Sequence, residues 1–92
     1  MRVGRSVRIS GRVQGVFYRG WTKNQAERLS VVGWVRNCSD GSVEAHLEGN
    51  AEAVERMIDA MRHGPSGAKV ERIEVEAIEV EKTERFKVRR CA

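Results

Sequence analysis

The spacing of apolar residues changes several times along this chain, and the order of these changes constrains the fold more than any other feature. Apolar residues at every second position indicate half-buried strands, whereas apolar residues three and four apart indicate amphipathic helices. The period changes in the order strand, helix, strand, strand, helix, strand, and one more short strand follows. The expected strands cover residues 3–13, 33–38, 43–48, 70–81 and 86–89, and the expected helices cover 20–31 and 51–63.

This order predicts an α+β fold of the ferredoxin-like type. It is a βαββαβ sandwich with both helices on one face of an antiparallel sheet, here with a short extra C-terminal strand. Right-handed crossovers place the strand at 43–48 between the first two strands, which then run in the same direction and end at one edge of the sheet. We therefore expect the loop at 14–19 to lie about 10 Å from Asn37, since neighbouring strands are spaced by roughly 4.8 Å.

Short-range signals set the expected ends of these elements. Gly33 is placed to stop the first helix, and Asn50 has a side chain that can cap the second.

The pair Asp40-Gly41 predicts a hairpin turn, because both residues tolerate the left-handed conformation that such a turn needs. The apolar phase slips in the fourth expected strand, which predicts a β-bulge near Ala77. The second helix carries one apolar stripe, formed by Val54, Met57, Ile58 and Met61.

The length and hydropathy of the chain limit its organisation. With 92 residues and 10.4 kDa, the chain is expected to form a single domain over residues 1–92. No apolar run approaches the roughly 18 residues of a membrane span, and the N-terminal stretch lacks the apolar core of a signal peptide. We therefore expect a cytoplasmic monomer that does not interact with membranes.

The positive charge is concentrated in the first half of the chain. Residues 1–40 contain eight Lys or Arg against two acidic residues, whereas residues 41–92 contain nine against eleven. A basic region favours an anionic partner, which could be nucleic acid, a phosphate or an acidic metabolite. Charge alone does not choose among these partners.

The cysteines and histidines do not form a pattern typical of a metal or redox site. Cys38 and Cys91 are too far apart in sequence for a zinc motif or a CxxC pair, and the simplest interpretation is two thiols. A bridge between them depends on a Cα separation that the sequence does not give. His46 falls in the polar phase of its strand and His63 at a helix end, so we expect structural or solvent-exposed roles for both. No metal site is predicted.

The segment GRVQGVFYR, residues 11–19, joins the first strand to the first helix. Gly15 allows the chain to curl, so that successive N–H groups can point inward and bind an anion together with the positive end of the following helix. The guanidinium of Arg19 can donate two parallel hydrogen bonds to a phosphate or a carboxylate. Taken alone, the segment fits an ordinary glycine turn followed by a solvated arginine better than a binding site.

A second segment, GWVRNCSDGSVEAHLEG at residues 33–49, changes that interpretation. Together the two segments resemble the acylphosphatase family, and the resemblance extends over nearly the whole chain. The first family motif is approximately G-x-V-Q-G-V-x-F-R, and the matching residues are Gly11, Val13, Gln14, Gly15, Val16 and Arg19. The matches to the second motif are Gly33, Trp34, Val35, Arg36, Asn37, Asp40, Gly41, Val43 and Gly49. Tyr18 stands where the family usually has Phe, and we expect it to add a hydroxyl near the pocket.

The resemblance implies an enzyme that hydrolyses the carboxyl-phosphate bond of small acyl phosphates to a carboxylate and inorganic phosphate. It implies two catalytic residues: Arg19 holds the phosphoryl group, and Asn37 orients the attacking water. Inorganic phosphate or other anions are then expected to bind as product or inhibitor, and no cofactor is expected. The implied phosphate-binding loop consists of Gln14, Gly15, Val16, Phe17, Tyr18 and Arg19.

The chemistry of the leaving group agrees with this function. A carboxylic acid has a pKa of roughly 4 to 5, so a carboxylate leaves at neutral pH without a proton from a general acid. A phosphate monoester leaves as an alkoxide and needs an acid or metal ions. The sequence shows no cysteine-containing phosphate loop, acidic metal cluster or catalytic histidine. We therefore expect metal-independent hydrolysis of acyl phosphates rather than phosphomonoesterase activity.

Two other functions compete with this one. RNA-recognition domains share the fold, but they need aromatic residues on the exposed face of the third strand, where this chain has Glu44, His46 and Glu48. Nucleic-acid binding is therefore the weaker hypothesis, and we expect Trp21 and Trp34 in the core or the pocket wall. Acylphosphatase-like domains also occur inside larger carbamoyl-transfer proteins, where a regulatory or accessory role is the alternative.

Overall fold

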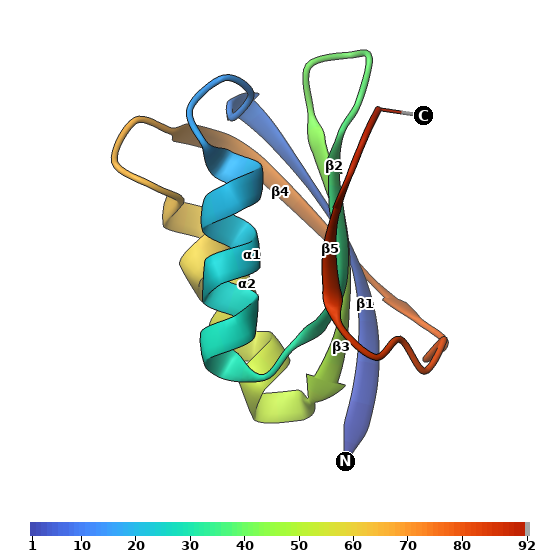
Figure 1. The fold of residues 1–92 in the computed structure, drawn as a ribbon. Coiled ribbons are helices and arrows are strands. Elements are labelled where there is room, and N and C mark those ends of the chain that lie inside the picture. Colours follow the sequence, from blue (N-terminus) through green and yellow to red (C-terminus); the bar gives the residue numbers. More distant parts are fainter. Residues whose placement is uncertain (92) are drawn as a thin grey trace.

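The protein has two helices packed on one face of a five-stranded sheet (Figure 1). The structure is a computed structural model and describes residues 1–91. The elements in chain order are β1 (Arg2–Arg12), α1 (Tyr18–Leu29), β2 (Val32–Asn37), β3 (Val43–Asn50), α2 (Ala51–His63), β4 (Lys69–Ile78) and β5 (Phe86–Arg89). Neither helix is long and apolar enough to cross a membrane, as far as residues 1–91 are concerned.

The strand order β4-β1-β3-β2-β5 confirms the expected ferredoxin-like topology. β3 lies between β1 and β2 and is antiparallel to both, so β1 and β2 run in the same direction. The extra strand β5 pairs in parallel with β2, which makes the sheet mixed. Consequently the ends of β1, β2 and β5 and the start of α1 all lie at one end of the molecule, opposite the N-terminus (Figure 1).

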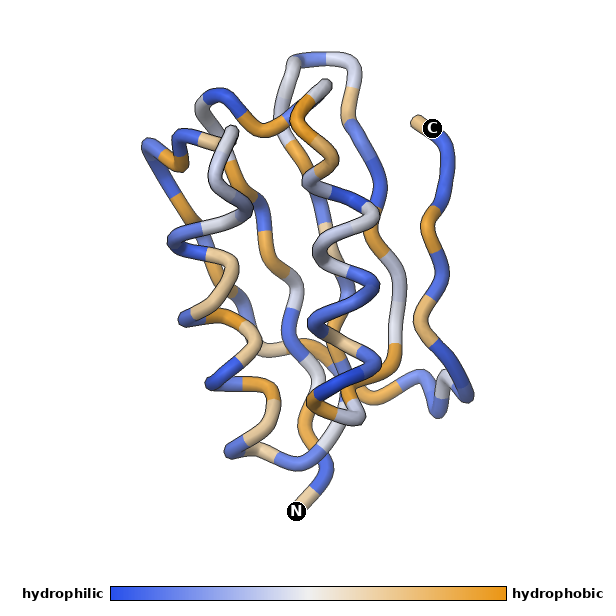
Figure 2. The backbone as a smooth tube through the Cα atoms, turned by 60° about the vertical axis from the view of Figure 1, so that its left-hand side comes forward, coloured by the Kyte–Doolittle hydropathy of each residue, from blue (hydrophilic) through white to orange (hydrophobic). Residues whose placement is uncertain are grey.

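The core lies between the helices and one face of the sheet, as the alternation of apolar and polar residues along the strands requires (Figure 2). Val7 and Ile9 of β1 and Ala45 and Leu47 of β3 are fully buried there. The expected apolar stripe of α2 is buried against them and is confirmed. Arg8, Glu44 and the other residues of opposite phase face the second side of the sheet, which carries no helix and is called the open face below.

α2 begins and ends as predicted, but α1 does not. The Asn50 carboxamide caps α2 by accepting a hydrogen bond from the Glu52 N–H at 3.0 Å. α1 begins two residues early and ends at Ser30, which adopts the left-handed conformation with φ 58°. Gly33 is therefore not the helix stop. A Cβ on Gly33 would lie 1.7 Å from the His46 carbonyl oxygen, so its role is to let β2 approach β3 closely.

The predicted β-bulge is present in β4 but lies elsewhere than expected. The β-bulge lies between the pairs Ser10–Arg72 and Gly11–Val70, so the extra residue is Glu71, whereas Ala77 pairs regularly with Arg5. Edge strand β4 is mostly exposed, and its apolar phase is therefore a weak guide to register.

The hairpin between β2 and β3 forms where expected. Its turn is closed by a hydrogen bond from the Gly41 N–H to the Cys38 carbonyl at 3.1 Å. Only Gly41, with φ 93°, is left-handed there, and the Asp40 carboxylate instead accepts from the N–H and hydroxyl of Ser42. The turn is thus a three-residue loop in which Gly41, but not Asp40, has the left-handed conformation expected of the pair.

Candidate active site

A pocket of about 270 Å³ lies where the β1–α1 loop, the start of α1 and the ends of β2 and β5 meet. Arg19 and Asn37, which are far apart in sequence, both line it. The pocket is smaller than the roughly 300–1,000 Å³ of sites for drug-sized ligands, so it suits a small group. Its lining residues are Val13, Gly15, Phe17, Tyr18, Arg19, Gly20, Asn37 and Val88.

The main chain of the β1–α1 loop curls around one side of the pocket. Gly15 has φ 74° and Phe17, the N-cap residue of α1, has φ 64°, so two left-handed residues turn the chain within three positions. Within residues 1–91, no protein atom accepts a hydrogen bond from the N–H groups of residues 15–20. These donors, next to the positive end of a helix, form a cradle for an anion.

The two helices differ at their N-terminal ends in a way that supports this assignment. α2 is capped by Asn50 and has Glu52 in its first turn, so its end is satisfied by its own side chains. α1 has neither a side-chain cap nor an acidic residue in its first turn. The partial positive charge of α1 is therefore available to a bound anion.

Arg19 is held against the last strand. Its Nη1 donates to the main-chain carbonyl of Arg89 in β5 at 3.2 Å, and no carboxylate within residues 1–91 forms an ion pair with it. The carbonyl fixes one of the five N–H donors of the guanidinium and leaves the others for a ligand. Arg19 therefore brings a full positive charge to the pocket, and this charge is not neutralised by an acidic side chain.

Asn37 is the last residue of β2 and points to the helix side of the sheet, as its pairing with Val43 requires. It lines the pocket, and no atom of residues 1–91 is hydrogen-bonded to its carboxamide. A carboxamide offers both an acceptor oxygen and two N–H donors. Asn37 can thus bind a water molecule and a phosphoryl oxygen at the same time.

Gln14 braces the loop instead of lining the pocket. Its Nε2 donates to the Cys38 carbonyl and to the Ser42 carbonyl, both at 2.8 Å, and so ties the loop to the β2–β3 turn. Val16 packs against the core and close to Gly67. Side chains of the predicted phosphate-binding loop thus divide into those that line the pocket and those that anchor the loop.

The hydroxyl of Tyr18 is not placed as the sequence suggested. It donates to the Met61 carbonyl of α2 at 2.6 Å, and Tyr18 is almost fully buried, which raises the pKa of its phenol. The ring still forms part of the pocket wall. Tyr18 therefore connects α1 to α2, and its hydroxyl is already engaged in this contact.

Comparisons with known proteins agree with this arrangement. The family model described as acylphosphatase matches residues 5–88. The acylphosphatase of Alcanivorax borkumensis is 57% identical over 70 residues, which cover 76% of either chain. The chain belongs to the acylphosphatase family. The solved structure of an acylphosphatase from Coxiella burnetii superimposes with a TM-score of 0.93 at 36% identity and covers 96% of this chain and 93% of that chain.

The same fold is found within a larger protein. A crystal structure of full-length HypF in a phosphate- and nucleotide-bound form matches 96% of this acylphosphatase with a TM-score of 0.90 at 29% identity, but only 12% of HypF is covered. The separate acylphosphatases of Alcanivorax borkumensis and Coxiella burnetii, in contrast, are matched over most of their own length.

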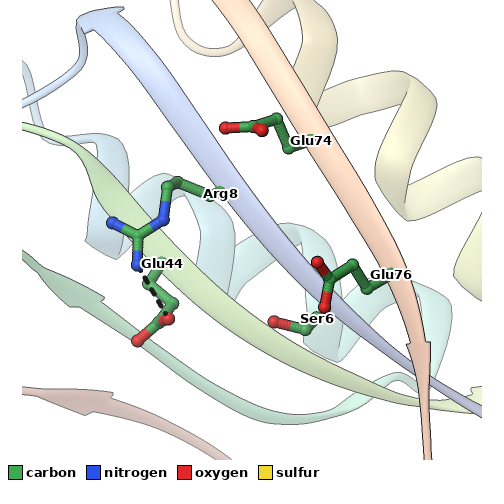
Figure 3. A pocket seen from close by; sticks show the side chains of 5 residues that line it. All are labelled: Ser6, Arg8, Glu44, Glu74 and Glu76. Carbon is green, nitrogen blue, oxygen red and sulfur yellow. Dashed lines mark hydrogen bonds and ion pairs between the residues drawn. The ribbon is translucent and has the colours of Figure 1, made fainter.

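A second hollow of about 160 Å³ lies on the open face of this acylphosphatase and is lined by Ser6, Arg8, Glu44, Glu74 and Glu76 (Figure 3). Three of its five residues are acidic. Its only basic group, Arg8, forms an ion pair with Glu44 at 3.2 Å and another with Asp40 at 3.7 Å. The hollow therefore disfavours anions, whereas the positive charge of the pocket at Arg19 favours them.

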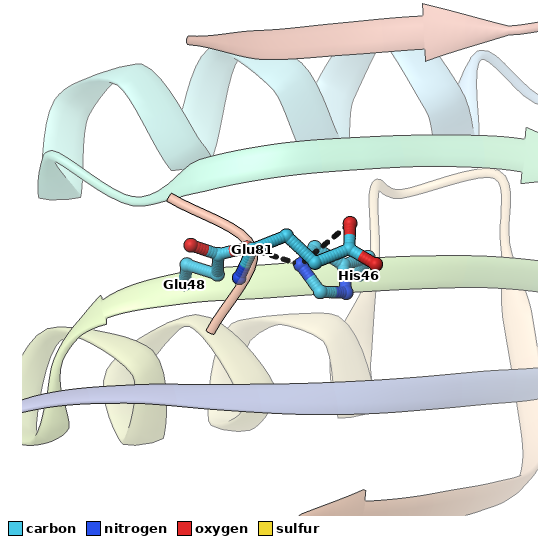
Figure 4. Close-up of side chains that lie close together, drawn as sticks. All are labelled: His46, Glu48 and Glu81. Carbon is cyan, nitrogen blue, oxygen red and sulfur yellow. Dashed lines mark hydrogen bonds and ion pairs between the residues drawn. The ribbon is translucent and has the colours of Figure 1, made fainter. Parts of the chain in front are cut away.

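His46, Glu48 and Glu81 form the group of residues most similar to a metal site within the described chain, with ligand atoms within 4.8 Å of one another (Figure 4). The Glu48 carboxylate already accepts hydrogen bonds from the main-chain N–H groups of Glu81, Lys82 and Thr83. It also accepts from the side chains of Arg2, His46 and Thr83. The Glu48 carboxylate is thus surrounded by hydrogen-bond donors. These donors stabilise it as a buried anion, and its oxygens are already engaged instead of being open to a metal cation.

Glu48 therefore has a structural role, because its carboxylate ties β3 to residues 81–83 of the connection between β4 and β5. These hydrogen bonds are called the Glu48 latch below. Burial alone would raise the pKa of Glu48, but the hydrogen bonds from His46, from the main chain of Glu81 and Thr83, and from Arg2 outweigh burial and lower the pKa to about 2. Sequence alternation placed His46 and Glu48 on an exposed face. That expectation is wrong, since His46 is 4% and Glu48 0% exposed beneath the connection from β4 to β5.

Trp34 also lies elsewhere than expected. Its ring is on the open face, where it stacks on His46 with ring centroids 6.0 Å apart. The guanidinium groups of Arg36 and Arg89 lie 5.1 Å from its centroid. Trp34 is therefore in neither the core nor the pocket wall, whereas Trp21 packs against the core as expected.

Proposed function

We propose that this acylphosphatase splits the carboxyl-phosphate bond by in-line attack of a water molecule that Asn37 orients, on a phosphoryl group held by Arg19 and by the main-chain N–H groups of residues 14–19. The observation that carries the proposal is that Arg19, Asn37 and the row of unpartnered N–H donors all border one small pocket. The family supplies the reaction class, and the geometry supports the role of each group.

Charge complementarity favours the phosphoryl group as the part of the substrate that enters the cradle. Its equatorial oxygens gain negative charge as the transition state forms, and donors placed beforehand around them stabilise that charge. Arg19 contributes a full positive charge whose position is fixed by the Arg89 carbonyl. The main chain of the loop contributes N–H dipoles whose direction is fixed by Gly15, Phe17 and the Gln14 brace.

Asn37 is suited to position the nucleophile. It approaches from β2, whereas the cradle is formed by the β1–α1 loop, so the two border different sides of the pocket. A water oxygen held by the carboxamide can then attack phosphorus opposite the leaving carboxylate. The new P–O bond forms as the bond to the acyl oxygen breaks, the electron pair leaves with the carboxylate, and the water proton passes to solvent or to the phosphate.

The leaving carboxylate is a weak base, which explains why the reaction needs neither a general acid nor a metal ion. A carboxylate with a pKa of roughly 4 to 5 leaves unprotonated at neutral pH, so the site needs no general acid. The positive charge of Arg19 and the N–H dipoles take the part that a metal ion plays in other phosphoryl-transfer enzymes. We therefore propose that hydrolysis is independent of metal ions.

Initial rates with benzoyl phosphate and with p-nitrophenyl phosphate, each measured with and without excess EDTA, test this proposal. We expect rapid hydrolysis of benzoyl phosphate that EDTA leaves unchanged, and little hydrolysis of p-nitrophenyl phosphate. Loss of benzoyl phosphate hydrolysis on chelation would show that a metal ion takes part. Comparable rates for the two substrates would show that the enzyme does not depend on an easy leaving group.

A further inference from the structure

The two cysteines follow the ends of neighbouring strands. β2 and β5 pair in parallel, and the last pair is Arg36 with Arg89. Continued for two more residues along each chain, this register would bring Cys38 opposite Cys91. Two residues far apart in sequence thus come to the same end of the sheet, which follows only from the pairing of β5 with β2.

Both thiols belong to the same side of the sheet. Arg36 and Arg89 both lie over the Trp34 ring on the open face, and residues two positions further along a strand point the same way. Cys38 and Cys91 accordingly line one hollow of about 270 Å³ together with Arg36. The Arg36 guanidinium also interacts electrostatically with both cysteines.

The strand spacing suits a disulfide. Paired strands lie about 4.8 Å apart, and disulfides join Cα atoms that are roughly 4.4–6.8 Å apart. In the structure both residues are present as thiols, and the pairing of β5 stops at Arg89. Closure requires that the pairing continue for two more residues.

We propose that Cys38 and Cys91 form a cross-strand disulfide by exchange with a low-molecular-weight disulfide, and that this bond extends the pairing of β5 with β2. Cys91 is exposed and Cys38 is half-buried, so the Cys91 thiolate attacks first and one small thiol leaves. The Cys38 thiolate then attacks the Cys91 sulfur and expels the second small thiol. The two protein thiols are oxidised, the small disulfide is reduced to two thiols, and the two protons pass to these products.

The bond would join two strands that both border the pocket. Asn37 immediately precedes Cys38, and the carbonyl that holds Arg19 lies two residues before Cys91. The proposal itself concerns a modification site and is independent of the catalytic roles proposed above. Its test therefore uses mass and thermal stability rather than turnover.

The experiment equilibrates the full chain in glutathione buffers from reducing to oxidising, stops exchange with acid, and measures intact mass and Tm. We expect a monomer lighter by two hydrogens, a peptide map that links Cys38 to Cys91, and a Tm higher by at least about 5 °C that dithiothreitol reverses. The matched variant Cys38→Ser should instead carry glutathione on Cys91 and show no rise in Tm. Glutathione adducts on both cysteines of the unaltered chain, or dimers linked through Cys91, would overturn the proposal.

Discussion

The Nε2 of Gln14 donates to the carbonyl of Cys38 at 2.8 Å, and Cys38 directly follows Asn37. A second bond from the same nitrogen, to the Ser42 carbonyl, fixes the side chain between the two ends of the β2–β3 turn. One carboxamide thus sets the position of the N–H cradle relative to the residue that we propose to orient water. We therefore expect the site to depend on this brace as well as on the groups that contact the substrate.

Replacing Gln14 by Met should lower kcat for benzoyl phosphate while the protein stays folded. Met retains the length of the side chain but cannot donate, so the loop and the end of β2 lose their connection. We expect the free energy of unfolding to fall by about 1–3 kcal/mol, because two carbonyl groups lose a partner. Gln25→Met, on α1 and outside the pocket, is the control and should leave kcat unchanged. Equal turnover in both variants would contradict the role of the brace.

Arg19→Lys should abolish most activity without unfolding the protein. Lysine keeps the charge but not the planar fork that donates to phosphate and to the Arg89 carbonyl together. We expect kcat/KM for benzoyl phosphate to fall by about 10²-fold or more, the range for loss of a preorganised donor. Arg12→Lys, an exposed arginine before the loop, is the matched control. Turnover close to that of the unaltered enzyme would exclude Arg19 from the mechanism.

Asn37→Ala should separate catalysis from binding. If Asn37 orients water, kcat should fall by about 10²–10³-fold, whereas the inhibition constant for inorganic phosphate should change little. Asn50→Ala is the control, because it removes an asparagine that only caps α2. It should lower the free energy of unfolding by about 1 kcal/mol and leave kcat intact. A parallel loss of phosphate affinity and kcat in Asn37→Ala would make Asn37 a binding residue.

The Glu48 latch should make stability depend on acid pH. The pKa of Glu48 is about 2 in the folded protein, below its ordinary value of 4.5, so the folded state binds this proton less readily than the unfolded state. The stability that Glu48 contributes is therefore fully present above about pH 4.5 and is lost as the pH falls toward about 2. We expect this contribution to be about 3 kcal/mol.

Denaturant unfolding of the unaltered chain and of Glu48→Gln at several pH values measures this effect. The difference in unfolding free energy should be largest near neutral pH and should shrink as the pH falls toward 2. Glu55→Gln, which changes an exposed glutamate on α2, should show no such dependence. A Glu48→Gln difference that stays constant with pH would mean that the carboxylate charge does not stabilise the latch.

The sequence predicted those parts of the molecule that depend on local pattern. The apolar stripe and Asn50 cap of α2 follow from residues close together in the chain, and the structure confirms both. The strand order followed from the handedness of crossovers, and it is also confirmed. The start of α1 could not be found in this way, because it depends on the left-handed conformation of Phe17, which no sequence pattern marks.

The remaining features depend on contacts between distant segments. Glu48 has the phase of an exposed residue, and only the connection that returns over β3 buries it. Likewise, the Arg89 carbonyl that holds Arg19 has no signature in the sequence, because any residue can supply a main-chain carbonyl. Arg19 and Asn37 were proposed as site residues because their motifs resemble those of a known family, but the contacts that hold them in place could not be proposed in this way.

The bond between Arg19 and the Arg89 carbonyl joins an early segment of the chain to a late one. A nascent polypeptide cannot complete this contact until β5 has been synthesised and has docked against β2. In a refolding experiment, recovery of full turnover would therefore require that β5 has docked against β2.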